Sequence, residues 1–260
     1  MSTLVMKFGG SSVTAPENFL SIANIIVERS KVFSKIAVVI SAMGNTTDQL
    51  IELAKKVHPD PPKREQDMLI SVGERISSAL LAMALARKGK EAISFTGSQS
   101  GIITSSNHAD AVIIDVKPGR LVSHLSLGKI VIVAGFQGVG LNGEITTLGR
   151  GGSDTTAVAL ATALGGCKVE FYKDVSGMYA QDPKINPLAH FYHKLNYDEA
   201  IAIAKKGGIV HPRALILAKK NGLSLRILSF LEYKTGSVEE LGTHIVPDID
   251  RPSPTYEEVP

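Results

Sequence analysis

The chain has a single cysteine, Cys167, and no tryptophan among its 260 residues. A lone cysteine excludes a disulfide framework or a multi-cysteine zinc site within one chain. We therefore expect Cys167 to be a small core residue in a cytoplasmic protein. No apolar run approaches the roughly 18 residues that cross a bilayer, and residues 1–8 lack the layout of a signal peptide. No membrane partner is expected.

An excess of charge of one sign is also lacking. The 28 basic and 25 acidic residues leave a net charge of +3, and aromatic residues make up only 5% of the chain. Nucleic-acid-binding proteins usually carry a basic stripe, in some classes interleaved with aromatic residues. The sequence has no such stripe, so we expect no nucleic-acid partner.

No GxxxxGK[ST] loop is present, so any ATP must bind without that phosphate cradle. Gly138, Gly140 and Gly143 do match the spacing of a dinucleotide-binding fingerprint. That fingerprint requires a helix directly afterwards, whereas Asn142-Gly143 is a hairpin signal and residues 144–148 have an extended pattern. We therefore predict a hairpin here and no dinucleotide site.

What is present is an alternation of apolar strands with helices. Hydrophobic residues make up 44% of the chain, and continuous apolar segments are followed by helical patterns. This order predicts an α/β fold with a mostly parallel sheet and right-handed crossovers. Strands are expected over residues 4–8, 36–40, 92–95, 111–116, 130–134, 169–173 and 224–229.

Helices and loops are expected between these strands. A capping box of Thr14 and Glu17 begins the first helix, a second helix covers about 49–57, and one uninterrupted helix covers about 64–87. The segment 96–107 is predicted to be a polar loop of the kind that covers a site.

The segment Thr146–Ala157 carries the densest group of chemically useful residues. Its three glycines precede an apolar helical pattern, for which Ser153 or Asp154 is the expected N-cap. Backbone N–H groups at such a helix start attract anions, and the planar guanidinium of Arg150 suits a carboxylate. The alternative is an ordinary strand-to-helix turn with a surface arginine.

Similar residues follow other strands, where open α/β sheets bind their ligands. Lys7 with Gly9-Gly10 ends the first strand and favours a phosphate contact, although most lysines are simply solvated. Small and hydroxyl residues between Ser41 and Thr47 follow the second strand. Asp174 follows the strand over 169–173 and begins a second site-like edge.

Gly73 lies within the predicted long helix. A glycine in a helix interior costs roughly 1 kcal/mol relative to alanine, so its presence suggests that another segment approaches this turn closely. The adjacent Glu74 is either a site residue or one half of an ordinary surface ion pair.

Taken together, these residues resemble those of the amino-acid kinase family, and within it the catalytic domain of the aspartate kinases. The resemblance covers most of the chain. It rests on Lys7-Phe8-Gly9-Gly10-Ser11-Ser12, Ser41-Ala42-Met43-Gly44 through Thr47, Gly73-Glu74-Arg75, Gly135-Phe136-Gln137-Gly138, Thr147–Thr156, and Lys173-Asp174-Val175 with Gly177, Tyr179 and Asp182-Pro183.

The resemblance implies one catalytic domain over residues 1–246, an αβα sandwich around a mostly parallel sheet of about eight strands. The N-terminal lobe, about 1–150, would hold an amino acid, and the C-terminal lobe, about 151–246, a nucleotide. Residues 247–260 are Pro-rich and acidic, which predicts a disordered tail or linker. No ACT domains are expected in this chain, and a homodimer is left open.

The implied reaction transfers the γ-phosphoryl group of ATP to the side-chain carboxylate of L-aspartate, the first step toward lysine, threonine, methionine and diaminopimelate. Mg²⁺ would be held mainly by the ATP phosphates and not by a protein metal site. The alternatives are a sister kinase acting on N-acetylglutamate, a nucleotide or carbamate, and a non-catalytic amino-acid or nucleotide sensor.

The resemblance also implies a role for each site residue. Lys7 and the amides of Gly9 and Gly10 would contact the transferring phosphoryl group, while Asp154 would hold Lys7. Arg150 would bind the α-carboxylate of aspartate. The implied substrate pocket consists of Ser41, Thr47, Glu74, Phe136, Arg150 and Ser153, with Glu74 pairing with the substrate ammonium. Lys7, Gly9 and Gly10 are also implied to contact the nucleotide. The other residues implied to border it are Lys173, Asp174, Tyr179 and Lys184.

Two positions depart from the family pattern. Lys173 stands where threonine is usual, and Gly208 stands where a lysine that contacts the nucleotide is expected. Our hypothesis is that Lys173, Lys205 or Lys206 supplies the missing cation. The alternative for Lys205 and Lys206 is that they only complement the dipole at the C-terminus of their helix.

Overall fold

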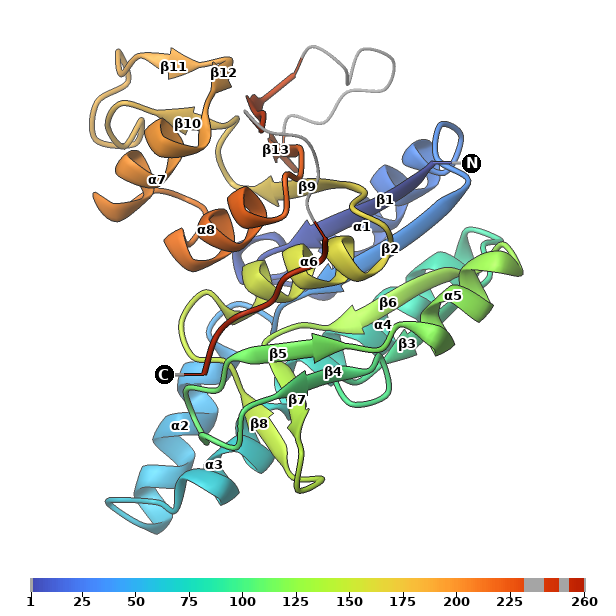
Figure 1. The fold of residues 1–260 in the computed structure, drawn as a ribbon, viewed down its shortest axis with the longest axis vertical. Helices are drawn as coiled ribbons and strands as arrows, with labels where there is room; N and C mark the ends of the chain where they lie inside the picture. Colours follow the sequence, from blue (N-terminus) through green and yellow to red (C-terminus); the bar gives the residue numbers. More distant parts are fainter. Residues whose placement is uncertain (1, 232–240, 248–252, 260) are drawn as a thin grey trace.

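The computed structural model describes residues 2–231, 241–247 and 253–259. Within these ranges a sheet of eight strands runs through the molecule in the order β12-β14-β13-β9-β1-β2-β6-β3 (Figure 1). Its neighbouring strands are parallel except for β13 and β14. The strands are β1 (Thr3–Phe8), β2 (Lys35–Ile40), β3 (Ala92–Phe95), β6 (Ile130–Ala134), β9 (Lys168–Lys173), β12 (Lys194–Leu195), β13 (Leu225–Ser229) and β14 (Thr243–Ile245).

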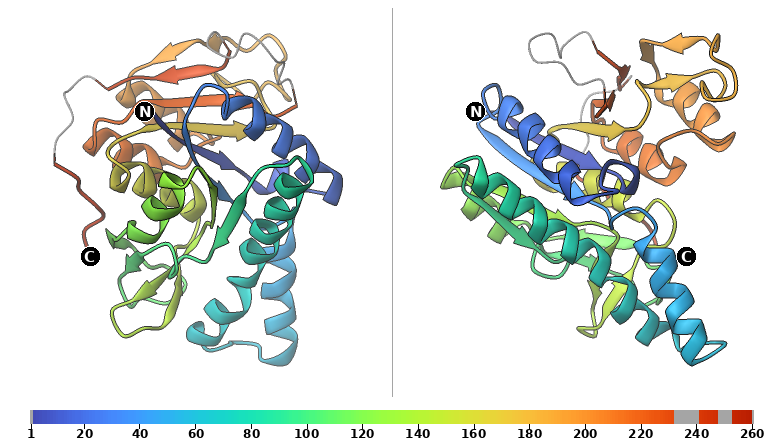
Figure 2. Two further views of the ribbon diagram at one scale, coloured as in Figure 1. Left: turned by 90° about the vertical axis from the view of Figure 1, so that its right-hand side faces the viewer. Right: turned by 180° about the vertical axis from the view of Figure 1, so that it is seen from behind.

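Helices pack on both faces of this sheet (Figure 2), so the predicted αβα sandwich is confirmed. Residues of α1 and α4 form the core on one face, and residues of α5, α6, α7 and α8 form it on the other. The helix bounds are α1 (Pro16–Arg29), α2 (Thr46–Val57), α3 (Lys63–Ile70), α4 (Val72–Arg87), α5 (Gly119–Ser126), α6 (Gly152–Ala163), α7 (Tyr197–Lys205) and α8 (Pro212–Lys220).

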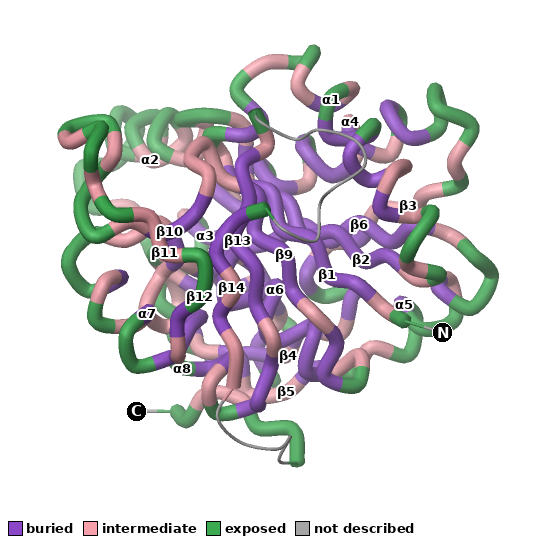
Figure 3. The backbone as a smooth tube through the Cα atoms, turned by 90° about the horizontal axis from the view of Figure 1, so that it is seen from above, coloured by how far each residue is buried: buried purple, intermediate pink, exposed green. Residues whose placement is uncertain are grey.

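The alternation of side chains along β1 decides where Lys7 points. Met6 and Phe8 pack on the α1 face, and Val5 packs on the α6 face. Successive strand residues face opposite sides of a sheet, so Lys7 shares the α6 face with Val5. Figure 3 shows that β1, β9 and α6 lie in the buried centre of the molecule.

A smaller sheet of four strands adjoins the large one, in the order β5-β4-β7-β8. Its antiparallel β7–β8 pair turns at Asn142-Gly143, which confirms the predicted hairpin. The prediction of a loop over 96–107 is wrong in part, because residues 102–104 form β4 and pair with β5 and β7. The strands are β4 (Ile102–Thr104), β5 (Ile113–Val116), β7 (Gln137–Gly140) and β8 (Ile145–Thr147), and a separate hairpin pairs β10 (Met178–Tyr179) with β11 (Phe191–Tyr192).

The predicted helix over 64–87 is divided at Ser71 into α3 and α4. The side-chain amide of Gln137 donates a hydrogen bond to the Ser71 carbonyl at 2.7 Å. Gly73 therefore lies in the first turn of α4 and not in the middle of a helix. The segment 63–87 contains no unbroken apolar run of membrane-spanning length, but its total length and mean hydropathy would allow it to cross a bilayer. Half of its most apolar window is buried inside the domain, as expected for a core helix.

Two other helix starts differ from the sequence prediction. The capping box of Thr14 and Glu17 is wrong, because Pro16 is the first helical residue and the Asn18 side chain accepts the Ala15 N–H at 2.9 Å. Proline fixes the first-turn backbone and so sets this boundary. The second helix begins at Thr46, three residues before the predicted start at Gln49.

Part of the predicted C-terminal tail packs against the domain. The Glu257 carboxylate accepts hydrogen bonds from the Ile113 N–H at 2.8 Å and from the Arg213 guanidinium. Asn221 exchanges two hydrogen bonds with the Thr255 backbone at 2.9 Å. The prediction of a disordered tail or linker is therefore wrong for this part, whereas residues 248–252 and 260 lie outside the described residues.

Candidate active site

The side chains of Lys7 and Asp154 meet at the carboxyl end of β1. Asp154 lies in the first turn of α6, and its Oδ1 is 2.7 Å from the Lys7 Nζ. The two side chains are 6% and 7% exposed. The structure thus brings this pair, expected from the sequence, into direct contact away from bulk water.

Asp154 accepts further hydrogen bonds from two other elements. The Nζ of Lys173, the last residue of β9, lies 3.3 Å from both carboxylate oxygens. The His211 backbone N–H, just before α8, donates to Oδ2 at 3.2 Å. A buried charge is tolerated when its lone pairs are satisfied in this way. Donors from three separate elements therefore fix one carboxylate.

Burial and ionic contacts compete in setting the charges of this group. Burial would raise the pKa of Asp154, but the nearby ammonium groups of Lys173 and Lys7 hold that pKa well below its ordinary value. Burial lowers the pKa of Lys173 to about 8, even though its contact with Asp154 acts in the opposite direction. Near neutral pH the Asp154 carboxylate is therefore ionised between cationic neighbours.

Gly151 sets the start of α6. It is the N-cap, its φ of 74° is left-handed, and a Cβ at this position would lie 2.1 Å from the His211 Cγ. Only glycine fits such a turn without strain and without this clash. The prediction that Ser153 or Asp154 is the N-cap is wrong, because both lie inside the first turn. There the Asp154 carboxylate benefits from the positive end of the helix dipole.

A cavity of about 660 Å³ opens beside this ion pair. Its walls come from the ends of β1 and β2, the segment after β6, α2, α3 and α4, and the loop before α6 with the first turn of that helix. It brings together all the predicted substrate-binding residues and most of the predicted catalytic ones. Those that line it are Lys7, Gly10, Ser41, Thr47, Glu74, Phe136, Arg150, Ser153 and Asp154; Gly9 is adjacent in sequence but does not line it.

Glu74 is placed in this cavity by a close contact between α4 and the end of β2. A Cβ on Gly73 would lie 2.8 Å from the Ala42 Cβ, so glycine permits the approach inferred from the sequence. The Ala42 N–H donates to Glu74 Oε1 at 3.1 Å. Glu74 is 3% exposed, and among the described residues its Oε2 has no hydrogen-bond partner. Burial raises the pKa of Glu74 to about 7.

Arg150 and Phe136 line the same cavity. The Arg150 side chain is exposed and forms no ion pair with any described residue. Phe136 has a left-handed φ of 67°, an uncommon conformation for a bulky residue, and such strain is typical of functional sites. Its N–H donates to Thr156 Oγ1 at 3.3 Å, and its carbonyl accepts the Leu148 N–H at 2.9 Å.

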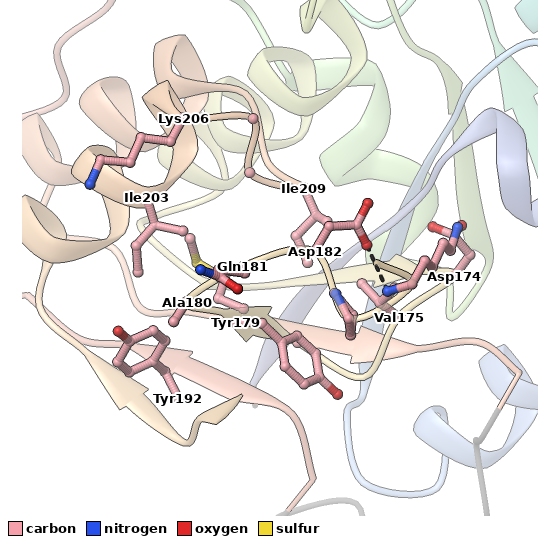
Figure 4. Close-up of a pocket in the computed structure, with 16 residues that line it drawn as sticks. Asp174, Val175, Tyr179, Ala180, Gln181, Asp182, Tyr192, Ile203, Lys206 and Ile209 are labelled. Carbon is pink, nitrogen blue, oxygen red and sulfur yellow. Dashed lines mark hydrogen bonds and ion pairs between the residues drawn. The ribbon is translucent and has the colours of Figure 1, made fainter. Parts of the chain in front are cut away.

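A second cavity, of about 290 Å³, lies beyond the end of β9. Figure 4 shows that its walls come from the segment after β9, from β10 and β11, and from α7 and the turn that follows it. The predicted nucleotide residues Asp174, Tyr179 and Lys184 line it, and the Lys184 Nζ is 2.5 Å from Asp174 Oδ2. This contact lowers the pKa of Asp174.

The predicted nucleotide residue Lys173 does not line this second cavity. Its ammonium lies 3.3 Å from the Asp154 carboxylate instead, and Asp154 lines the first cavity. Of the other two lysines considered as replacements for the cation absent at Gly208, Lys206 lines the second cavity and Lys205 does not.

Several lining residues were missed by the sequence reasoning. The first cavity also contains Gln66 and Ala109. Ala109 has a left-handed φ of 70°, and its N–H donates to the buried Asp67 carboxylate at 3.1 Å. No local sequence pattern predicts these residues, because their helix and loop are far apart in the sequence and are joined by hydrogen bonds from His108 and Ala109 to Asp67. The role of the His211 backbone was also missed, and the Pro212 that follows was the only available signal for a helix start there.

No group of three or more His, Cys, Asp or Glu side chains that could hold a metal ion occurs among the described residues. Asp154 is already occupied by lysines, and Asp174 is paired with Lys184. The protein side chains near the two cavities therefore do not form an oxygen-ligand cage of the kind that binds Mg²⁺ or Ca²⁺ by itself.

The fold is an α/β fold with cavities at the carboxyl ends of parallel strands, which is where such folds usually bind their ligands. Residues 2–229 match the amino acid kinase family, and the chain belongs to that family.

Within the amino acid kinase family, the chain is similar to several aspartate kinases. The chain is 48% identical over 241 residues to an aspartokinase of Bacillus sp. (strain MGA3), covering 92% of this chain and 59% of the relative. The crystal structure of aspartate kinase from Synechocystis has a TM-score of 0.82 at 39% identity, over 98% of this chain and 42% of that one. E. coli aspartokinase III, solved with aspartate and ADP, has a TM-score of 0.81 at 23% identity, over 96% and 65%. The chain thus spans less than two thirds of the curated relatives' length.

Replacing Glu74 by glutamine should change the pH dependence of stability. The pKa of Glu74 is about 7 in the folded chain and 4.5 ordinarily, so its protonated form stabilises the fold below about pH 4.5. That contribution is lost as the pH rises to 7. One pKa unit corresponds to about 1.4 kcal/mol, so Glu74→Gln should gain about 2–3 kcal/mol relative to wild type between pH 4.5 and 8.

This expectation is measured by urea unfolding at several pH values without ligand. Glu52→Gln on the exposed face of α2 is the control for the same substitution outside the cavity. A difference between Glu74→Gln and wild type that does not change with pH would show that the Glu74 charge is not buried.

Proposed function

We propose that this chain transfers the γ-phosphoryl group of ATP to the side-chain carboxylate of L-aspartate, the reaction of an aspartate kinase and the entry to lysine, threonine and methionine synthesis. One observation carries this proposal. The cavity beside the Lys7–Asp154 pair contains a buried carboxylate oxygen of Glu74 with no partner among the described residues, and an arginine, Arg150, with no ion pair there. A free amino acid supplies the missing counterpart of each, an ammonium and a carboxylate.

We assign Glu74 to the substrate ammonium and Arg150 to the α-carboxylate. A substrate ammonium would satisfy Oε2 and would favour the ionised form of Glu74, so binding should release a proton near neutral pH. The Arg150 guanidinium is suited to a bidentate contact with a carboxylate. Ser41, Thr47, Phe136 and Ser153 would complete the pocket wall around the substrate.

The chemical difficulty of the reaction is charge and not proton transfer. The side-chain carboxylate of free aspartate, with a pKa of about 3.9, is ionised at neutral pH and needs no general base. It must approach an anionic phosphoryl group, so the protein contributes alignment and positive potential. Lys7, held by Asp154, would supply that potential together with the amides of Gly9 and Gly10.

The nucleotide would occupy the second cavity, beside Asp174, Tyr179 and Lys184. From there its phosphates would extend toward Lys7. Mg²⁺ neutralises phosphate charge when it is bound to ATP, and we propose that the phosphates themselves hold it.

The other functions fit the cavity less well. N-Acetylglutamate carries no ammonium, so it would supply no positive charge to the buried Glu74 carboxylate. A nucleotide acceptor or carbamate likewise carries no ammonium. A sensor without activity would not need two ammonium groups, those of Lys7 and Lys173, on the buried Asp154 carboxylate beside the aspartate cavity.

The proposal is tested by an ADP-release assay with hydroxylamine trapping of the acyl phosphate. The acceptors are L-aspartate, N-acetyl-L-aspartate, L-glutamate, N-acetyl-L-glutamate, carbamate and UMP. We expect ADP and hydroxamate with L-aspartate and at least about 100-fold less with N-acetyl-L-aspartate, which differs only at the amine. Arg150→Lys should raise the KM for aspartate, because an ammonium cannot reproduce the bidentate contact.

Turnover of an acetylated acceptor or of UMP in place of aspartate would identify a sister kinase. Tight binding of aspartate and ATP with no ADP from any acceptor would identify a sensor. Either result contradicts the proposal.

We further propose that Lys206 supplies the nucleotide-site cation that is absent at Gly208. Lys206 lines the second cavity and the neighbouring Lys205 does not, which makes the two residues a matched pair. Lys206→Met should raise the KM for ATP about three- to tenfold, whereas Lys205→Met should leave it unchanged. Equal KM values for both variants and wild type would reject Lys206.

A further inference from the structure

Lys173 and Lys7 approach Asp154 from neighbouring parallel strands. In the register of β1 and β9, Lys7 is opposite Phe171 and Phe8 is opposite Tyr172. Lys173 is two residues beyond Phe171, so the two lysines share the face of the sheet that is covered by α6. Their Nζ atoms lie 2.7 Å and 3.3 Å from the Asp154 carboxylate. One carboxylate thus holds two ammonium groups at the same end of the sheet.

This arrangement leaves excess positive charge inside the protein. The Lys173 side chain is only 11% exposed and that of Lys7 6%. The charged groups that face Lys173 are Lys7 from β1, Asp154 from α6 and Asp174, the next residue, which is itself paired with Lys184. At the start of α8, His211 contributes its backbone N–H to Asp154. Two cations on one carboxylate would be better stabilised with an anion beside them.

The position of Lys173 indicates which anion that is. Asp154, its partner, lines the cavity assigned to aspartate, and Asp174, its neighbour in sequence, lines the cavity assigned to the nucleotide. Lys173 therefore connects a residue of one cavity with a residue of the other, and a triphosphate that reached from the nucleotide cavity to the aspartate cavity would come near its ammonium.

We propose that Lys173 is a second catalytic cation, which contacts the γ-phosphoryl group together with Lys7 as that group transfers. The proposal rests on the proposed kinase function. In the step, a carboxylate oxygen of aspartate forms a bond to the γ-phosphorus while the bond from that phosphorus to the β,γ-bridging oxygen breaks. The bond's electron pair remains on ADP, and no proton moves. Both lysines stay protonated and balance the charge on the transferring group.

The lowered pKa of Lys173, about 8, gives this role a distinct signature. In the free enzyme, kcat/KM for ATP should decline on the alkaline side with an apparent pKa near 8, as Lys173 loses its proton. Lys173→Arg keeps a charge that does not titrate in this range, so the decline should move to higher pH.

The first arm of the experiment measures turnover. Lys173→Met should lower kcat about 10- to 100-fold with the KM for aspartate changed less than twofold, and Lys173→Arg should restore at least a third of the wild-type rate. Lys219→Met is the matched control. It removes an ammonium that also lies close to an aspartate, 2.6 Å from Asp198, but on the surface, and it should leave both constants unchanged.

The second arm needs no turnover. Calorimetry compares the affinities of MgATP and MgADP for wild type, Lys173→Met and Lys219→Met. The preference for ATP over ADP should fall at least threefold in Lys173→Met alone, because the lost contact is to the γ-phosphoryl group. Unchanged aspartate affinity in the same samples shows that the variant is folded.

An unchanged ATP preference in Lys173→Met overturns the proposal, whatever happens to the rate. A slow variant that Lys173→Arg does not rescue also overturns it and leaves Lys173 as a structural partner of Asp154. If wild type itself gives no ADP with aspartate, the proposed function fails, while the calorimetry still decides whether Lys173 contacts the γ-phosphoryl group.

Discussion

The ion pair between Lys7 and Asp154 is the interaction on which the rest of the site depends. Removing both charges from water is costly, and a buried pair is retained only when its remaining polar atoms are satisfied. Here the Asp154 carboxylate also accepts from Lys173 and from the His211 N–H. With Lys173 added, the group has two ammonium ions on one carboxylate and is a site of net positive charge at the end of β1.

The fold supplies each part of this arrangement from a different element. The alternation of β1 turns Lys7 toward α6, and the parallel neighbour β9 delivers Lys173 to the same end of the sheet. Gly151 allows α6 to begin directly against His211, so Asp154 falls in the first turn. One cavity contains the ion pair and, among the described residues, groups without partners that suit an amino acid, and the other lies beyond the end of β9.

Sequence patterns predicted the parts of this structure that local chemistry determines. Continuous apolar segments such as 36–40 and 130–134 became central parallel strands, because both of their faces are buried. The glycine at position 73 correctly indicated a close approach, which proved to be to Ala42.

Features set by distant contacts were not predictable. The break at Ser71 coincides with a hydrogen bond from Gln137, and the docking of the C-terminal segment depends on Arg213 meeting Glu257. The direction of the Lys173 side chain follows from the position of Asp154 on another element. A family pattern places Lys173 beside a nucleotide, but it does not show which of its neighbours the ammonium contacts.

The central claim is that Asp154 acts by holding Lys7 in place, and a double-mutant cycle tests it most directly. The kcat with aspartate and ATP is measured for wild type, Lys7→Met, Asp154→Asn and the double variant. If Asp154 acts mainly through Lys7, the double variant should be slower than Lys7→Met by clearly less than the factor that Asp154→Asn costs in wild type, and the remaining loss is the part that acts through Lys173. Rate losses that multiply, so that the double variant is slower than Lys7→Met by the full factor of Asp154→Asn, would contradict the account.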